Sequence, residues 1–180
     1  EKYAHITYFI NGGFAAPLNG EDREVVKSAA IKSYVGKPEM NAKEVTDKIL
    51  AYFKKDKYDF ICVNYPNADM LGHTGDFAAA EKAVNFLDKQ VKRLVEEVVE
   101  RKGGQLILLA DHGNAEEMIN LESGEPYTEH TTNPVPFILI RKDIIGKTLK
   151  KGRLCDVAQT LLELMGVKAP NEMTGICLLE

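Results

Sequence analysis

A long amphipathic repeat passes directly into a short apolar run between residues 77 and 110. Apolar side chains recur at helical spacing over residues 77–102, with acidic residues on the opposite face. Gly103 and Gly104 then end the predicted helix, because glycine accepts the left-handed conformation of a helix C-terminus. The run QLILLA follows at once in residues 105–110 and is typical of a buried strand. A helix joined so closely to a buried strand predicts a layered α/β fold.

Other segments repeat this alternation of helix and strand. Helical repeats begin at Asn41 and at Asp156, and each opening fits a capping box. Short runs rich in β-branched and aromatic residues are typical of strands, and they lie at residues 6–10, 59–64 and 136–140. Strands that alternate with helices favour a mostly parallel sheet flanked by helices. No repeat or linker interrupts the chain, so we expect a single domain over residues 1–180.

Charge and cysteine content narrow the possible partners and compartment. The formal net charge of -4 argues against a nucleic acid or an anionic membrane as partner, since either would call for a basic surface. No apolar run is long enough to span a bilayer. The three cysteines are widely spaced, which is typical of free thiols in a reducing compartment. We therefore expect a cytoplasmic monomer.

Polar residues after the apolar runs form the candidate site. In open α/β sheets, ligands bind beyond the carboxyl ends of strands. Two carboxylates and three imidazoles lie at or near such ends, namely Asp69, His73, Asp111, His112 and His130. The first two are four residues apart, so one helical turn would point both side chains the same way. This mixed oxygen and nitrogen set suits Mn²⁺, Zn²⁺, Fe²⁺ or Co²⁺ and is large enough for a neighbouring pair of ions.

A candidate ligand or charged residue taken alone has a simpler interpretation than a functional site. A lone histidine is more often a surface or hydrogen-bonded residue than a metal ligand, and His5 is interpreted as structural. A terminal lysine such as Lys2 is by default solvated. Arg23 fits a surface ion pair better than a substrate contact. The three His/Asp clusters together, in this order, favour metal binding over these alternatives.

Longer strings around the clusters carry a family resemblance. The strings DFICVNYPNADMLGHTG, ADHGNAE and EHTTNPVPFIL, in this order and spacing, resemble the cofactor-independent phosphoglycerate mutases. KYAHITYFINGG and NEMTG extend the resemblance over nearly the whole chain. It implies an alkaline-phosphatase-like domain that holds two divalent metal ions. It also implies interconversion of 3- and 2-phosphoglycerate through a phosphoserine intermediate, without 2,3-bisphosphoglycerate.

The same resemblance implies roles for single residues. One ion would bind three of the candidate ligands and the other the remaining two, that is, Asp69, His73 and His130 for the first and Asp111 and His112 for the second. Lys2 matches a lysine that neutralises phosphoryl oxygens in the active site. Mn²⁺ is the favoured metal, with Mg²⁺, Co²⁺ or Zn²⁺ as alternatives. The substrate would be the small molecule phosphoglycerate.

The sequence also departs from the family pattern. In the family, the nucleophilic serine, an aspartate of the second metal site and the inserted substrate-binding domain come from an amino-terminal segment that precedes this chain. Ser28, Ser33 and Ser123 do not have the context of that serine. We therefore expect an incomplete domain that is inactive alone. Two alternatives stay open, namely a metal-binding module completed by a partner chain and a stand-alone metal-dependent phosphatase.

Overall fold

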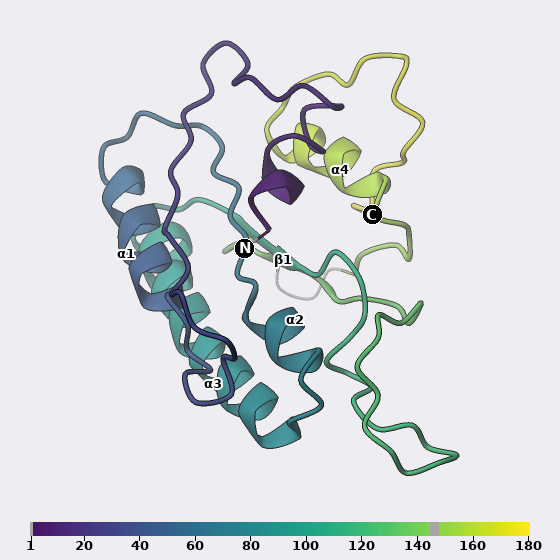
Figure 1. Cartoon of the computed structure of the whole chain (residues 1–180). Coiled ribbons are helices and arrows are strands. Elements are labelled where there is room, and N and C mark those ends of the chain that lie inside the picture. Colours follow the sequence, from purple (N-terminus) through teal and green to yellow (C-terminus); the bar gives the residue numbers. More distant parts are fainter. Residues whose placement is uncertain (1, 145–147) are drawn as a thin grey trace. The chain divides into compact units, whose positions relative to one another are not determined.

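The computed structural model describes residues 2–144 and 148–180 (Figure 1). The chain forms two compact units, the first ending at Ile140 and the second beginning at Arg141. Among the described residues, no helix combines the length and the apolar character that a membrane crossing requires.

The first unit contains five helical segments among its described residues. They are η1 (Tyr3–Ile6), α1 (Ala42–Phe53), α2 (Asn67–Gly72), α3 (Phe77–Leu94) and the π-helical continuation η2 (Val95–Arg101). The helix predicted over 77–102 is confirmed, and its start is fixed by Asp76, whose carboxylate accepts a hydrogen bond from the Ala79 N–H at 2.9 Å. The capping box expected at Asn41 is wrong, because the Asn41 amide instead donates to the Lys27 carbonyl at 2.7 Å.

The core of this unit lies where α2 packs on α3. Its buried residues are Tyr34, Met40, Leu71, Ala79, Ala80, Ala83 and Met118. The inward face of α3 is built of alanines, and small side chains let a second helix approach closely. Val84, which the helical repeat placed inward, is 50% exposed because the contact with α2 lies around the alanines. The tight packing gives α2 a fixed position.

Polar contacts fix α2 further. Asn67, at its first turn, is completely buried and donates to the carbonyls of Pro38 and Glu39 at 2.9 and 3.0 Å. Leu71, one turn on, is also completely buried. With this side of α2 held inside the core, Asp69 and His73 are carried on a rigid support.

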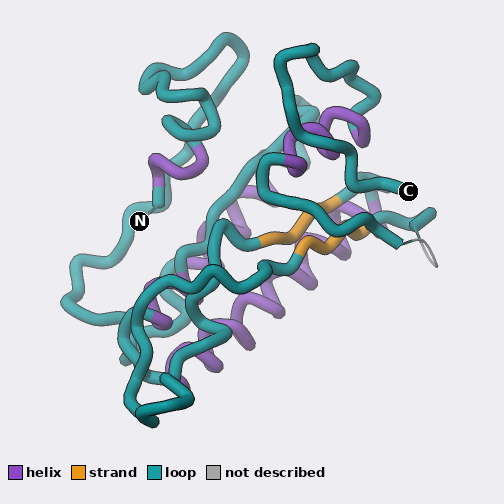
Figure 2. Tube along the Cα trace, turned by 90° about the vertical axis from the view of Figure 1, so that its right-hand side faces the viewer, coloured by secondary structure: helices purple, strands orange, loops and turns teal. Residues whose placement is uncertain are grey.

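The sheet of the first unit has two described strands, β1 (Leu106–Leu109) and β2 (Phe137–Ile140) (Figure 2). Both strands were predicted from the sequence, and the α/β class is confirmed. They pair antiparallel, with Leu106 opposite Ile140, so the expectation of a mostly parallel sheet is wrong for the described strands. The reason is the connection, which is an irregular hairpin with further antiparallel bridges at Gly113–Thr131 and Ile119–Pro126. A hairpin returns the chain at the end where β1 stops.

Two predicted strands are wrong. Of residues 6–10, Ile6 ends η1 and the others form turns, with the Phe9 N–H donating to the Ala4 carbonyl at 3.0 Å and the Asn11 N–H to the Thr7 carbonyl at 2.9 Å. Residues 59–64 have no strand pairing within the described chain. A strand needs a neighbour for its backbone N–H and C=O groups, and local apolar character cannot supply one. Both segments consequently leave apolar side chains exposed, Phe9 among them at 63%.

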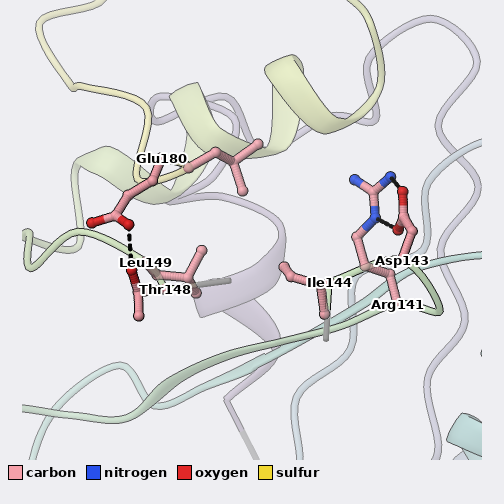
Figure 3. Close-up of a pocket in the computed structure, with 7 residues that line it drawn as sticks. Arg141, Asp143, Ile144, Thr148, Leu149 and Glu180 are labelled. Atoms are coloured by element: carbon pink, nitrogen blue, oxygen red, sulfur yellow. Dashed lines mark hydrogen bonds and ion pairs between the residues drawn. The ribbon is translucent and has the colours of Figure 1, made fainter. Parts of the chain in front are cut away.

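The second unit is built around α4 (Asp156–Leu164), whose predicted start at Asp156 is confirmed. The Asp156 carboxylate does not take part in a capping box but accepts hydrogen bonds from the Arg153 and Ile176 N–H groups at 2.7 and 2.9 Å. A hollow of about 100 Å³ in this unit is lined mainly by Arg141, Asp143, Leu149 and Glu180 (Figure 3). Arg141 and Asp143 already pair with each other, and none of the predicted ligands lines this hollow.

Candidate metal centre

The first unit brings all of the predicted site residues together. They come from four places, namely the residue before η1, α2 and its C-cap, the loop that follows β1, and the return arm of the hairpin before β2. The residues are Lys2, Asp69, His73, Asp111, His112 and His130. The contact between α2 and α3 and the pairing of β1 with β2 therefore bring Asp69 and His130 together across 61 residues of sequence, and Lys2 joins Asp111 from 109 residues away.

The first predicted ligand set converges on one point. Donor atoms of Asp69, His73 and His130 all lie within 4.8 Å of one another. The His130 Nε2 is 3.1 Å from both Asp69 Oδ1 and His73 Nε2, and Asp69 Oδ1 is 3.3 Å from His73 Nε2. Such spacing fits a shared ion, because divalent metals bind these atoms at about 2.0–2.2 Å. The residues present therefore fit a metal ion of the predicted kind.

The orientation of the His73 ring is set by a backbone carbonyl. His73 Nδ1 lies 2.6 Å from the Thr128 carbonyl oxygen. A carbonyl oxygen can only accept, so Nδ1 must carry the proton and donate. Nε2 then keeps its lone pair and faces Asp69 and His130. A second partner of this kind is the usual way in which proteins fix a metal-binding histidine.

The second predicted pair, Asp111 and His112, contacts a lysine. The Lys2 ammonium donates to Asp111 Oδ2 at 3.0 Å and to His112 Nε2 at 2.9 Å. It also lies 3.4 Å from Asp69 Oδ2. Burial raises the pKa of the Asp111 carboxyl, but the hydrogen bond and the charge of Lys2 outweigh it, so that this pKa is lowered. The side chain of Lys2 is only 10% exposed, unlike that of a solvated terminal lysine.

The two sets are adjacent. His112 Nε2 is 3.7 Å from Asp69 Oδ1. The rings of His112 and His130 are stacked, with centroids 3.8 Å apart. The cluster thus contains two carboxylates, three imidazoles and one ammonium in contact. Such a set can hold cations next to a negatively charged group. Phosphoryl transfer requires this arrangement of charges.

Glycines allow close packing behind the ligands. Gly72 lies against the buried Asn114, where an added Cβ would be 1.6 Å from the Asn114 Oδ1. Gly113, next to His112, would place a Cβ 2.1 Å from the Thr131 hydroxyl. Sequence reasoning missed Thr128 and Asn114 as supports. Asn114 is in the string ADHGNAE and Thr128 directly precedes EHTTNPVPFIL, but the sequence gives no sign of which loops touch.

Two residues considered in the sequence lie outside the cluster. His5 is exposed in η1, edge-on to Phe9 with ring centroids 5.8 Å apart. Arg23 pairs with Glu21 and donates to the Ala15 carbonyl at 2.7 Å. The hydrogen bond from Arg23 is the main reason that the pKa of Glu21 is lowered to about 2. The geometry of Arg23 is that of an ion pair within its own segment.

Comparison with known proteins places the chain among metal-dependent enzymes. A sequence profile described as the metalloenzyme superfamily matches residues 1–169. The 2,3-bisphosphoglycerate-independent phosphoglycerate mutase 2 of Methanosarcina barkeri is 52% identical over 179 residues, which are 99% of this chain and 34% of the relative. The 2,3-bisphosphoglycerate-independent mutase of Clostridium perfringens strain SM101 is 49% identical over 180 residues, or 35% of its length.

A solved structure agrees with these relatives. A crystal structure described as Leishmania mexicana phosphoglycerate mutase at low cobalt concentration superimposes with a TM-score of 0.87 and 28% sequence identity. The match covers 99% of this chain and 35% of that one. The chain thus spans about a third of the length of the relatives that it matches.

Proposed function

Because the chain belongs to the metalloenzyme superfamily, we propose that it is the metal-binding part of a cofactor-independent phosphoglycerate mutase. The observation that carries the proposal is the convergence of donor atoms from Asp69, His73 and His130 within 4.8 Å, beside Asp111 and His112. Identities near 50% to enzymes of that name support it. The substrate class is then a phosphoglycerate, and no 2,3-bisphosphoglycerate is needed.

The donor set supports divalent metals. Superfamily membership implies divalent metal binding, and the mixture of carboxylates and imidazoles suits several ions. We propose two ions in the whole enzyme, with Mn²⁺ favoured and Mg²⁺, Co²⁺ or Zn²⁺ as alternatives. When bound, such ions lower the pKa of an attacking hydroxyl and neutralise phosphoryl oxygens.

The candidate residues of this chain would have separate roles in binding the metal ions and the substrate. Asp69, His73 and His130 would hold one ion, while Asp111 and His112 would contribute to the site of the other. The Thr128 carbonyl would keep the His73 proton on Nδ1. Lys2 would release Asp111 and direct its charge at a phosphoryl oxygen of the substrate, since a lysine is a movable point charge.

The rest of the catalytic machinery would come from outside these residues. In this proposal the whole chain, residues 1–180, is part of one alkaline-phosphatase-like domain, because the superfamily profile runs through both compact units. The nucleophilic serine and the inserted substrate-binding domain would be supplied by other segments of the enzyme. The isolated chain would then be inactive, and the whole enzyme would be a cytoplasmic monomer.

A chimera tests the proposal directly. The matching third of the Methanosarcina barkeri relative is replaced by this chain, since the two are 52% identical over 179 residues. We expect the purified chimera to interconvert 3- and 2-phosphoglycerate in the presence of Mn²⁺. His73→Ala should abolish this activity. His5→Ala is the matched control, because His5 is a histidine of the same unit outside the cluster, and it should leave the activity near that of the unchanged chimera.

Three results would count against the proposal. A folded chimera with no mutase activity, or one whose activity survives His73→Ala, would remove the assigned role of the cluster. Hydrolysis of p-nitrophenyl phosphate by the 180-residue chain alone, lost in His73→Ala, would identify a stand-alone phosphatase instead.

A further inference from the structure

The two arms of the hairpin between β1 and β2 both carry candidate ligands. Asp111 and His112 lie on the outgoing arm, and His130 lies on the returning arm. Among the described residues, one backbone hydrogen bond joins the arms beside the ligands, from the Thr131 N–H to the Gly113 carbonyl at 2.9 Å, and the next, from the Tyr127 N–H to the Met118 carbonyl at 2.9 Å, lies farther out. One such bond beyond the end of a two-stranded sheet is a weak connection, because isolated hairpins are marginally stable in water.

The carboxylate of Glu116 bridges the same two arms. One oxygen accepts from the Asn114 backbone N–H at 2.6 Å on the outgoing arm. The other accepts from the Thr131 hydroxyl and from the Asn133 side-chain amide at 3.1 Å on the returning arm. An ionised carboxylate only accepts hydrogen bonds, and its two oxygens can take several at once. Glu116 is thus suited to tie three donors together.

Gly113 makes this bridge possible. An added Cβ at Gly113 would lie 2.1 Å from the Thr131 hydroxyl oxygen and 2.4 Å from a Glu116 carboxylate oxygen. A side chain at position 113 would therefore occupy the space in which Glu116 and Thr131 meet. Gly113 and Glu116 therefore serve the same contact: the glycine leaves the space, and the glutamate fills it.

We propose that Glu116 is a positioning residue that locks the arm carrying Asp111 and His112 to the arm carrying His130. The locked arms hold the His112 and His130 rings stacked at a centroid distance of 3.8 Å. The inference extends the proposed function, on which its relevance to metal binding rests. Glu116 touches no candidate ligand itself and acts through the backbone of its neighbours.

Glu116→Gln tests the lock, and Glu117→Gln is its matched control. Glutamine keeps the shape of the side chain but turns one acceptor oxygen into a donor, which would face the existing donors. The Glu117 carboxylate accepts from the Asn133 amide at 2.8 Å, and within the described part of the chain it accepts no hydrogen bond from the Asn114 N–H or the Thr131 hydroxyl. Both variants change the net charge equally, so a difference between them reports the bridge rather than the charge.

The first readout is independent of metal. Amide hydrogen exchange of Thr131, followed by NMR, should be faster in Glu116→Gln than in the wild type and unchanged in Glu117→Gln. The second readout is binding of Co²⁺, whose visible absorption reports ligand geometry. Loss of a group that orients ligands typically weakens metal affinity about 10–100-fold. Because Glu116 is exposed to solvent, we expect about tenfold, with an altered Co²⁺ spectrum.

A further variant covers the case in which Glu116→Gln does not fold. Thr131→Val removes the hydroxyl donor while keeping the β-branched shape, and it should reproduce both effects, whereas Thr131→Ser should retain the wild-type behaviour. Unchanged exchange in Glu116→Gln and Thr131→Val would overturn the lock, and so would equal effects in Glu117→Gln. If the wild type binds no Co²⁺, the proposed function fails, and the exchange rates still decide whether the lock exists.

Discussion

Lys2→Met should strengthen cation binding at the Asp111–His112 pair. The Lys2 ammonium lies 2.9 Å from His112 Nε2 and 3.0 Å from Asp111 Oδ2. A divalent ion would need those same atoms at about 2.0–2.2 Å. The ammonium and the ion cannot share them, so binding of the ion must first displace the lysine. Methionine fills similar space without a charge and removes this competition.

The size of the effect follows from the contact that is lost. A hydrogen bond to a charged group contributes about 1.5–3 kcal/mol. The Asp111 side chain is 41% exposed, so solvent screening favours the lower end of that range. A difference of about 1.4 kcal/mol is a factor of ten in affinity. We therefore expect Lys2→Met to raise the affinity of the second Mn²⁺ site about tenfold.

Isothermal titration calorimetry with Mn²⁺ measures this change. Lys48→Met is the control for the altered net charge, because Lys48 pairs with Glu24 at 2.9 Å and is not part of the cluster. It should bind Mn²⁺ as the wild type does. Weaker binding in Lys2→Met would show that Lys2 organises the ligands rather than competing for them. Unchanged binding would show that Lys2 is solvated in solution, and either result refutes the reasoning.

Three further predictions concern pH and packing. Mn²⁺ affinity should fall on acidification, because protons compete with the metal for the imidazole nitrogens and carboxylate oxygens; a flat affinity from pH 8 to 5, measured by calorimetry, would argue against this ligand set. Gly72→Ala should lower the free energy of unfolding by about 1–3 kcal/mol in a urea titration, since its Cβ would lie 1.6 Å from Asn114 Oδ1. Hydrogen bonds from the Ile176 and Arg153 N–H groups lower the pKa of Asp156 below its ordinary value of 3.8. The ionised Asp156 therefore stabilises the folded state fully above that pH, and this stabilisation is lost as the pH falls through the lowered pKa. Thermal unfolding between pH 5 and 2 should show a smaller acid-induced loss of stability in Asp156→Asn, and equal losses would contradict this.

The helices could be predicted well because their causes are local. The repeat over 77–102 and the start at Asp156 depend on side-chain spacing within one segment. The strands at 105–110 and 136–140 were also found, and they have each other as neighbours. Residues 6–10 and 59–64 have equally apolar sequences but find no strand partner among the described residues. Pairing depends on the rest of the fold, which a local pattern does not contain.

The candidate ligands could be predicted, but their supports could not. The imidazoles and carboxylates stand out because their chemistry is unusual after an apolar run, and the structure brings all of them together. The Thr128 carbonyl is a backbone group with no signal in the sequence, and the Glu116 carboxylate looks like any exposed acid. Glu116 acts through contacts across the hairpin, and Thr128 through a contact with His73, 55 positions away at the end of α2. Only the paired arms of the hairpin reveal which backbone groups face which side chains.

The most direct test of the account is Mn²⁺ binding to the wild type, to His130→Ala and to His5→Ala, measured by isothermal titration calorimetry. We expect a tight site in the wild type that is lost in His130→Ala and kept in His5→Ala, because His130 Nε2 lies 3.1 Å from both Asp69 Oδ1 and His73 Nε2. No binding by the wild type, or binding that is indifferent to His130, would contradict it.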